Sequence, residues 1–180
     1  MAENVILVDE KDNEIGTMPK MEAHVSGVLH RAFSVFIFNQ NGELLLQQRA
    51  LDKYHSGGKW TNTCCSHPRV GEETLAAANR RLLEEMGMEC ELNYGFNFLY
   101  KADVENGLIE HEFDHVYYGI CDDLPAINLT EVAAYKYVKI DTLRLDLEKN
   151  PALYTEWLKI SFNKVLALYK TLFLTYANSN

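Results

Sequence analysis

The segment from Gly71 to Met88 constrains the fold of this chain more than any other. It predicts a helix over Thr74–Met86. Leu82, Leu83 and Met86 follow Leu75 by seven, eight and eleven residues, and these spacings keep apolar side chains on one helix face. Gly87 follows directly and is expected to end the helix with a left-handed C-cap. A helix with one apolar face must bury it against another element, so the neighbouring segments decide the fold.

Most of the other predicted elements are strands. Arg31–Asn39 is rich in aromatic and β-branched residues, and Asn41-Gly42 separates it from the apolar segment Glu43–Gln48, which is the pattern of a β-hairpin. Further strands are expected at Val5–Val8, Ile15–Thr17, Tyr94–Tyr100, Val116–Cys121 and Tyr135–Ile140, and helices at Thr142–Glu148, capped by Asp141, and from about 151 to 174, beginning at Asn150-Pro151. This order predicts an α/β chain (mixed α+β) with a mixed β-sheet flanked by helices.

The composition is that of an acidic globular protein. The chain has 180 residues, with 17 Lys and Arg against 26 Asp and Glu, which gives a net charge of −9. We expect no general nucleic-acid binding, because that needs clustered cations, and no membrane helix, because that needs about 20 consecutive apolar residues. The start of the chain lacks the basic region of a signal peptide. Four cysteines without a CxxC pair predict reduced thiols and a cytoplasmic location: Cys64, Cys65, Cys90 and Cys121.

The predicted helix also carries a charged pattern. Seven residues fall in the register of the Nudix box, G-x5-E-x7-R-E-U-x-E-E-x-G-U, where U is a bulky apolar residue: Glu72, Arg80, Leu82, Glu84, Glu85, Gly87 and Met88. The resemblance to this box implies a loop and a helix that place carboxylates around a Mg²⁺ ion, which in turn binds a diphosphate. Ser66 stands where the box has its first glycine, and Arg81 stands where it has a glutamate.

Arg81 has an ordinary interpretation and a functional one. The ordinary one is a surface ion pair with Glu85, four residues later on the same helix face, worth about 0.3–0.5 kcal/mol. The register of the surrounding box favours the functional one. A cation in place of a carboxylate removes a metal ligand of a Nudix hydrolase and adds a contact for phosphate, so the site is expected to hold a diphosphate but to perform other chemistry.

Several strings resemble the type 1 isopentenyl-diphosphate isomerases, a family of the Nudix superfamily, over residues 4 to 162 approximately: His24, His30–Ser34, Gln48–Ala50, Trp60–Pro68, Glu110–Glu112 and Trp157. The resemblance implies a Nudix-like fold, a mixed β-sheet sandwiched between helices. It implies one isomerase domain over residues 1–180, with a core over about 4–162 and a C-terminal amphipathic helix over about 151–174.

The resemblance also implies a reaction. Isopentenyl diphosphate becomes dimethylallyl diphosphate in isoprenoid biosynthesis by protonation at one carbon and deprotonation at another, on opposite faces, through a tertiary carbocation. Cys65 and Glu112 match the two acid/base groups. Cys65 is selected over Cys64 because one residue separates the family's cysteine from His-Pro, although either cysteine alone is more often a buried apolar residue. Tyr100 matches a tyrosine beside the catalytic carboxylate, and Trp157 matches an indole that faces the carbocation.

Two cations follow from the resemblance. One divalent ion would be bound by His24, His30, His67, Glu110 and Glu112, a donor set that suits Mn²⁺, Mg²⁺ or Zn²⁺. A Mg²⁺ ion bridging the diphosphate would be bound by Glu85 and the backbone carbonyl of Cys65. Four cations would hold the diphosphate: Lys20, Arg49, Lys53 and Arg81. The remaining histidines, His55, His111 and His115, are interpreted as ordinary structural residues.

The implied partner is therefore a small isoprenoid diphosphate, with neither nucleic acid nor a membrane, and the oligomeric state is left open. Two rival functions remain, namely a Nudix hydrolase that cleaves a diphosphate and a non-catalytic ligand sensor on the same scaffold. Arg81 and the set formed by Cys65, His67 and Glu112 favour the isomerase.

Overall fold

The computed structural model describes residues 3–174. The strands are β1 (Asn4–Val8), β2 (Glu14–Pro19), β3 (His30–Phe38), β4 (Glu43–Arg49), β5 (Trp60–Thr61), β6 (Cys64–Ser66), β7 (Asn93–Asp103), β8 (Ile109–Ile120) and β9 (Val132–Lys139). The helices are α1 (Lys20–Ser26), α2 (Thr74–Met86), α3 (Ile140–Lys149) and α4 (Glu156–Tyr169), with short 3-10 helices at Glu105–Gly107 and Pro151–Leu153 and a π-helical turn at Lys170–Leu174.

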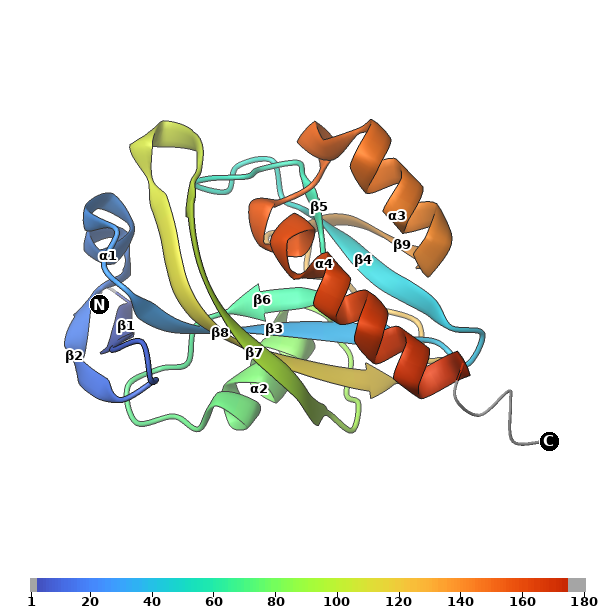
Figure 1. Ribbon diagram of the computed structural model, residues 1–180, viewed down its shortest axis with the longest axis horizontal. Helices are drawn as coiled ribbons and strands as arrows, with labels where there is room; N and C mark the ends of the chain where they lie inside the picture. Colours follow the sequence, from blue (N-terminus) through green and yellow to red (C-terminus); the bar gives the residue numbers. More distant parts are fainter. Residues whose placement is uncertain (1–2, 175–180) are drawn as a thin grey trace.

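Strand β3 is the centre of a mixed, nine-stranded sheet (Figure 1). Along one edge it pairs antiparallel with β1, β6 and β4 in turn. Along the other edge it pairs with β8 in parallel, over its whole length from His30, opposite Glu112, to Phe38, opposite Ile120. Strand β7 continues the sheet beyond β8, and β5 and β9 continue it beyond β4. The predicted mixed sheet and its central hairpin are confirmed.

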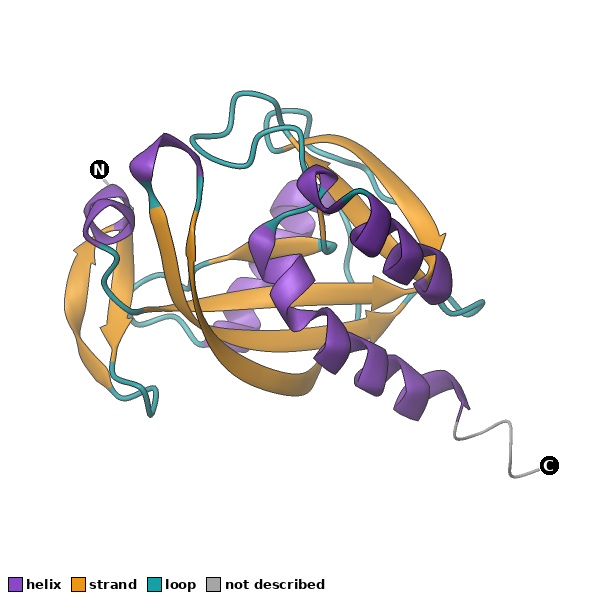
Figure 2. Ribbon diagram, turned by 45° about the horizontal axis from the view of Figure 1, so that its top comes forward, coloured by secondary structure: helices purple, strands orange, loops and turns teal. Residues whose placement is uncertain are grey.

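Helices cover both faces of this sheet because side chains alternate along β3. Phe33, Val35 and Ile37 point into a core with α2. Phe36 and Phe38 point to the opposite face, into a core with α3 and α4. Figure 2 shows α3 and α4 in front of the sheet and α2 behind it. The sandwich of a sheet between helices that the resemblance implied is therefore the observed architecture.

Helix α2 has the predicted bounds, and Gly87 ends it in the left-handed conformation at φ 62°. Its buried face differs from the prediction, because Leu75 and Leu83 are 42% and 50% exposed. Leu82 and Met86 are buried in a stripe with Ala78 at steps of four residues. Leu83 lies about 100° around the helix from Leu82, which places it outside this narrow stripe.

Other boundaries shift where tertiary pairing decides them. The strand expected at Val116–Cys121 is the end of the longer β8, and α1, β5 and β6 were not predicted. Helix α3 begins at Ile140 with Lys139 at its N-cap, so Asp141 lies in the first turn and is not the cap. The last helix begins at Glu156 and not near residue 151, because Tyr154 forms a β-bridge with Trp60. The part of the predicted domain beyond residue 174 lies outside the described residues.

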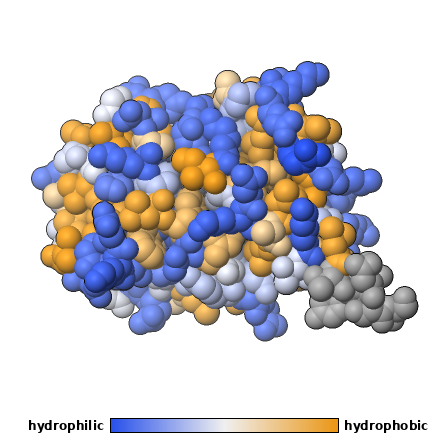
Figure 3. Space-filling view, in the orientation of Figure 1, coloured by the Kyte–Doolittle hydropathy of each residue, from blue (hydrophilic) through white to orange (hydrophobic). Residues whose placement is uncertain are grey.

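The surface is mixed in character. On the face seen in Figure 3, hydrophobic and hydrophilic residues are interspersed, as is usual for folded proteins, whose surface is more than half apolar. Among the helices within residues 3–174, none has the length and apolar character needed to cross a membrane.

Candidate active site

A pocket with an empty volume of about 550 Å³ collects most of the predicted site residues. Eleven predicted residues line it: Lys20, Arg49, Lys53, Cys65, His67, Arg81, Glu85, Tyr100, Glu110, Glu112 and Trp157. The remaining two predicted residues, His24 and His30, are fully buried against this lining.

The parallel register of β3 and β8 builds the histidine and carboxylate cluster. His30 begins β3 directly opposite Glu112 of β8, and Glu110 lies two residues earlier on the same face of β8. His24 comes from α1, and His67 follows β6. The Nε2 atoms of His67 and His30 lie 2.9 and 3.6 Å from Glu112 Oε1. The Nε2 atom of His24 lies 3.5 Å from Glu110 Oε1.

The hydrogen bonds of two histidines prepare their Nε2 atoms for a cation. His24 Nδ1 lies 2.7 Å from the carbonyl oxygen of Lys20, and His30 Nδ1 lies 2.8 Å from that of Val28. A carbonyl only accepts, so each Nδ1 carries the hydrogen and the neutral ring has its lone pair on Nε2. Within the described residues, both Nε2 atoms and Glu110 Oε2 are buried without a hydrogen-bond partner. Lone pairs that converge on carboxylates in this way fit a divalent cation.

Both oxygens of Glu112 are engaged. The Tyr100 hydroxyl donates a hydrogen bond of 2.7 Å to Oε2, and His67 lies against Oε1. Burial raises the pKa of Tyr100, and the negative charge of Glu112 adds to this shift, so the phenol remains a donor. Burial lowers the pKa of His67 to about 4, although Glu112 opposes the shift, so this imidazole is neutral near pH 7. Neutral imidazole is the form that binds metals.

The two adjacent cysteines point to opposite faces of the sheet, because side chains alternate along β6. Cys65 is half-buried and lines the pocket, whereas Cys64 is fully buried in the core beneath α2. Both are free thiols. Burial raises the pKa of Cys65, although Arg49 opposes the shift, so its thiol is protonated near pH 7.

Trp157, in the first turn of α4, forms an apolar wall of the pocket. Its indole nitrogen donates a hydrogen bond of 3.1 Å to Asn62 Oδ1, which fixes the orientation of the ring. The guanidinium carbon of Arg49 lies 5.3 Å from the centre of that ring. A buried indole with this contact already accommodates a positive charge beside it.

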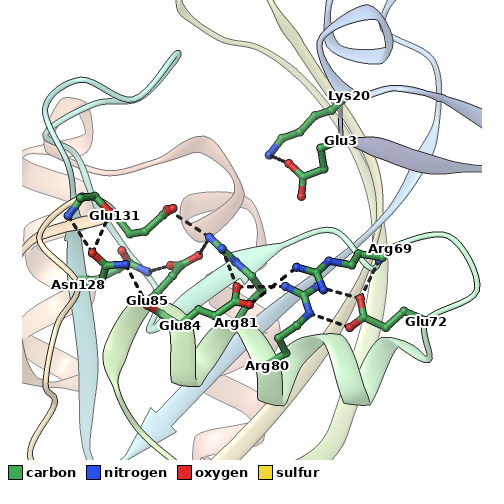
Figure 4. Close-up of polar contacts among 12 residues, drawn as sticks. Glu3, Lys20, Arg69, Glu72, Arg80, Arg81, Glu84, Glu85, Asn128 and Glu131 are labelled. Carbon is green, nitrogen blue, oxygen red and sulfur yellow. Dashed lines mark hydrogen bonds and ion pairs between the residues drawn. The ribbon is translucent and has the colours of Figure 1, made fainter. Parts of the chain in front are cut away.

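Arg81 connects the pocket to the acidic end of α2 (Figure 4). Its guanidinium lies 2.5 Å from Glu85 Oε1 and 3.2 Å from Glu131 Oε2, and Lys53 also pairs with Glu131. Burial lowers the pKa of Arg81, but the neighbouring carboxylates Glu85, Glu131 and Glu84 are among the groups that together outweigh this and raise it, so the arginine stays charged. Arg80 points away from the pocket toward Glu72. Of the two neighbouring arginines, only Arg81 is therefore placed to meet an anion there.

Sequence reasoning missed three acidic or basic residues around the pocket. Asp114 continues the buried face of β8 after Glu112, and burial together with the charge of Glu112 raises its pKa well above the usual range. Glu131 pairs with two of the predicted cations. His55, which we interpreted as an ordinary histidine, is buried in the pocket beside Glu110. The alternation of β8 could have identified Asp114, whereas nothing in local spacing marks the other two.

The chain is similar in sequence to known proteins. The model of the NUDIX domain matches residues 28–158. The chain is 54% identical over 161 residues to "Isopentenyl-diphosphate Delta-isomerase" of Pectobacterium atrosepticum, which covers 89% of this chain and 90% of that protein. It is 50% identical over 167 residues to "Isopentenyl-diphosphate Delta-isomerase 2" of Aromatoleum aromaticum, which covers 93% of this chain and 88% of that protein.

Solved structures show the same fold at low sequence identity. The protein DR0079 from Deinococcus radiodurans superposes with a TM-score of 0.74 at 18% identity, covering 90% of this chain and 98% of its own. A MutT protein from Methanosarcina mazei superposes with a TM-score of 0.63 at 16% identity, covering 76% of this chain and 91% of its own.

Proposed function

This chain belongs to the isopentenyl-diphosphate Delta-isomerase family of NUDIX proteins and interconverts isopentenyl and dimethylallyl diphosphate, and we propose that Cys65 and Glu112 carry the two proton transfers of that reaction. The first transfer protonates an alkene, and the second removes a proton from another carbon. A positioned acid and a positioned base contribute about 10²–10⁴-fold each to such steps. The reaction therefore needs two separate groups at one pocket.

The placement of these two groups around β3 carries the proposal. Cys65 lies on β6, opposite Ser34 of β3, and Glu112 lies on β8, opposite His30 of β3. Because β6 and β8 pair with the two different edges of β3, the thiol and the carboxylate reach the pocket from strands that flank β3 on either side. Proton transfers on opposite faces of a small substrate require an arrangement of this kind.

Two aromatic residues complete the proposed reaction site. Tyr100 donates its hydroxyl hydrogen to Glu112 and holds that carboxylate in one orientation. Trp157 presents a buried indole to the position of the tertiary carbocation, where cation–π attraction is worth about 2 kcal/mol or more once water is excluded.

We assign the divalent cation to His24, His30, His67, Glu110 and Glu112, on the support of the Nε2 lone pairs of His24 and His30 and of the clustering of these side chains. When bound, the ion supplies positive charge beside Glu112 and thereby lowers the affinity of that carboxylate for a proton. Imidazole nitrogens and carboxylate oxygens together suit Mn²⁺, Zn²⁺ or Mg²⁺. Within the protein, these residues fix the position of Glu112 relative to the substrate.

The diphosphate is assigned to the four cations of the pocket lining, Lys20, Arg49, Lys53 and Arg81. Charge-assisted hydrogen bonds to phosphate are among the strong ones in proteins. Glu85, which is oriented by Arg81 and by a hydrogen bond of 2.8 Å from Gln47, is the proposed protein carboxylate for Mg²⁺, together with the carbonyl oxygen of Cys65. An acidic protein can in this way bind a small anion.

Catalysis by a free thiol supports the proposed cytoplasmic location, because that compartment keeps thiols reduced.

The reaction class is tested by incubation of the protein with isopentenyl diphosphate and Mg²⁺ in D₂O. We expect dimethylallyl diphosphate with deuterium at the allylic carbons, because Cys65 and Glu112 exchange their protons with solvent between turnovers. NMR and mass spectrometry would measure the product and its deuterium content. Release of phosphate or of isopentenyl monophosphate would instead indicate the hydrolysis that is typical of other Nudix enzymes. Absence of both reactions at any substrate concentration would favour a ligand sensor.

Substitution of Arg81 tests the proposed binding of the diphosphate. We expect Arg81→Gln to raise KM for isopentenyl diphosphate about ten-fold or more, because a hydrogen bond between charged groups contributes about 1.5–3 kcal/mol. Arg80→Gln is the matched control, since Arg80 pairs with Glu72 and Glu84 outside the pocket. Both variants would be compared by steady-state kinetics and by thermal unfolding. Equal KM values in the two variants would contradict the proposed contact of Arg81 with phosphate.

A further inference from the structure

His55 is buried at the metal cluster although it belongs to a loop. The loop connects β4 to β5, and His55 is only 3% exposed there. The Arg49 guanidinium donates a hydrogen bond of 3.2 Å to the carbonyl oxygen of His55, and the Gly58 amide donates one of 3.1 Å to the carbonyl oxygen of Arg49. A Cβ atom at Gly57 would approach the carbonyl oxygen of Leu51 to 2.5 Å, so the tight path of this loop requires glycine. The loop therefore holds the His55 ring in a defined place.

The hydrogen bonds behind His55 determine which of its nitrogens carries a hydrogen. The hydroxyl of Ser56 donates its single hydrogen to Glu105 Oε2 at 3.2 Å, and the Ser56 amide donates to the same oxygen at 3.0 Å. The hydroxyl oxygen can then only accept from His55 Nδ1, which lies 3.2 Å away. The Nε2 atom of the neutral His55 ring consequently has a lone pair, as in His24 and His30.

That lone pair faces a carboxylate. His55 Nε2 lies 2.7 Å from Glu110 Oε1, closer than the Nε2 of His24, which lies 3.5 Å from the same oxygen. The contact lacks hydrogen-bond geometry, and within residues 3–174 His55 Nε2 is buried without a hydrogen-bond partner. Two lone pairs at this distance repel each other unless a cation attracts both. The same conflict at His24 and Glu110 is resolved by the proposed divalent ion.

We infer that His55 is a further ligand of this divalent cation, bound through Nε2 as a fourth imidazole beside His24, His30 and His67. The inference rests on the proposed metal centre. His24 joins the two halves of the site, because its ligand atom lies within 4.8 Å of those of His30, His67 and Glu112, and also within 4.8 Å of those of His55 and Glu110. A donor set enriched in imidazole favours Zn²⁺ and neighbouring transition metals over Mg²⁺.

The test is metal binding by the full-length His55→Ala variant, prepared free of metal. Calorimetric titration with Co²⁺ gives the affinity and the number of ions per chain, and pulsed EPR of the Mn²⁺-loaded protein counts the imidazole nitrogens on the ion. We expect one ion per chain in the wild type, one imidazole nitrogen fewer in the variant, and a loss of affinity above about 100-fold. Removal of a residue that only orients a ligand costs about 10–100-fold.

The control variant is His115→Ala. His115 bonds to Asp12 at 2.8 Å, away from the cluster, and its removal should leave both readouts unchanged. An unchanged nitrogen count in His55→Ala would overturn the inference, whatever the affinity, because His55 would then only position Glu110. Binding of two ions per wild-type chain would also overturn the inference, because His55 and the other three histidines would then not share one ion. If His67→Ala loses the ion while the ion in His55→Ala keeps all its imidazole nitrogens, the proposed metal centre stands but His55 is not one of its ligands. If the wild type binds no ion, the metal centre and the role of His55 are both overturned.

Discussion

Cys65→Ser is expected to lower kcat for isopentenyl diphosphate by about 10³-fold, within the range of about 10²–10⁴-fold for a positioned acid or base. A serine hydroxyl has nearly the same shape as the thiol but is a much weaker acid, so it cannot supply the proton or accept it at a useful rate. Burial raises the pKa of Cys65, and the protonated thiol is the form in the resting pocket. The measurement is isomer formation under saturating substrate.

Cys121→Ser is the control for this result. Cys121 is a half-buried free thiol that lies directly after β8 and outside the pocket lining. Its activity should match that of the wild type. Activity of Cys65→Ser close to the wild type, with the same thermal stability, would exclude a proton transfer by this thiol.

Glu112→Gln is expected to reduce kcat by about 10³-fold or more. The amide keeps the shape of the side chain and can still accept the hydrogen bond from Tyr100. It cannot take up a proton from the substrate, and it is a weaker ligand for a cation beside His30 and His67. Kinetics and bound metal would be measured on the same preparation, so that loss of the base can be separated from loss of the ion.

Asp114→Asn offers a matched comparison on the same face of β8. Burial and the charge of Glu112 keep the Asp114 carboxyl neutral, and it accepts a hydrogen bond of 2.8 Å from Ser34, which an asparagine oxygen can also accept. We therefore expect this variant to retain most of the activity. If Glu112→Gln and Asp114→Asn were equally active, Glu112 would not be the base.

Local sequence patterns predicted the elements that local interactions form. Helix α2 and its end at Gly87 follow from periodicity and from a single left-handed residue. The short strands β5 and β6 and the helix α1 were missed because they have few residues and depend on pairing or packing with distant segments. The late start of α4 has the same origin, since the bridge between Tyr154 and Trp60 connects segments that are far apart in the chain.

The candidate site was predictable where motifs specify residue types at fixed spacing. The resemblance selected Cys65 over Cys64, and the structure brings Cys65 to the pocket with the predicted cations and carboxylates. His55 was not predictable from these motifs, because its relation to Glu110 joins a loop to a strand 55 positions later. Only the folded arrangement of the chain brings these two side chains together.

The pairing of β8 with β3 has a consequence for which changes in chain length the protein tolerates. Glu110, Glu112 and Asp114 face the interior, and His111 and Phe113 alternate with them. Insertion or deletion of one residue in β8 would turn the three carboxyl groups to the other face of the sheet, since side chains alternate with a period of two. The irregular segment between β8 and β9 carries no such alternation. Length variation among relatives of this enzyme should therefore accumulate in that connection and be excluded from β8.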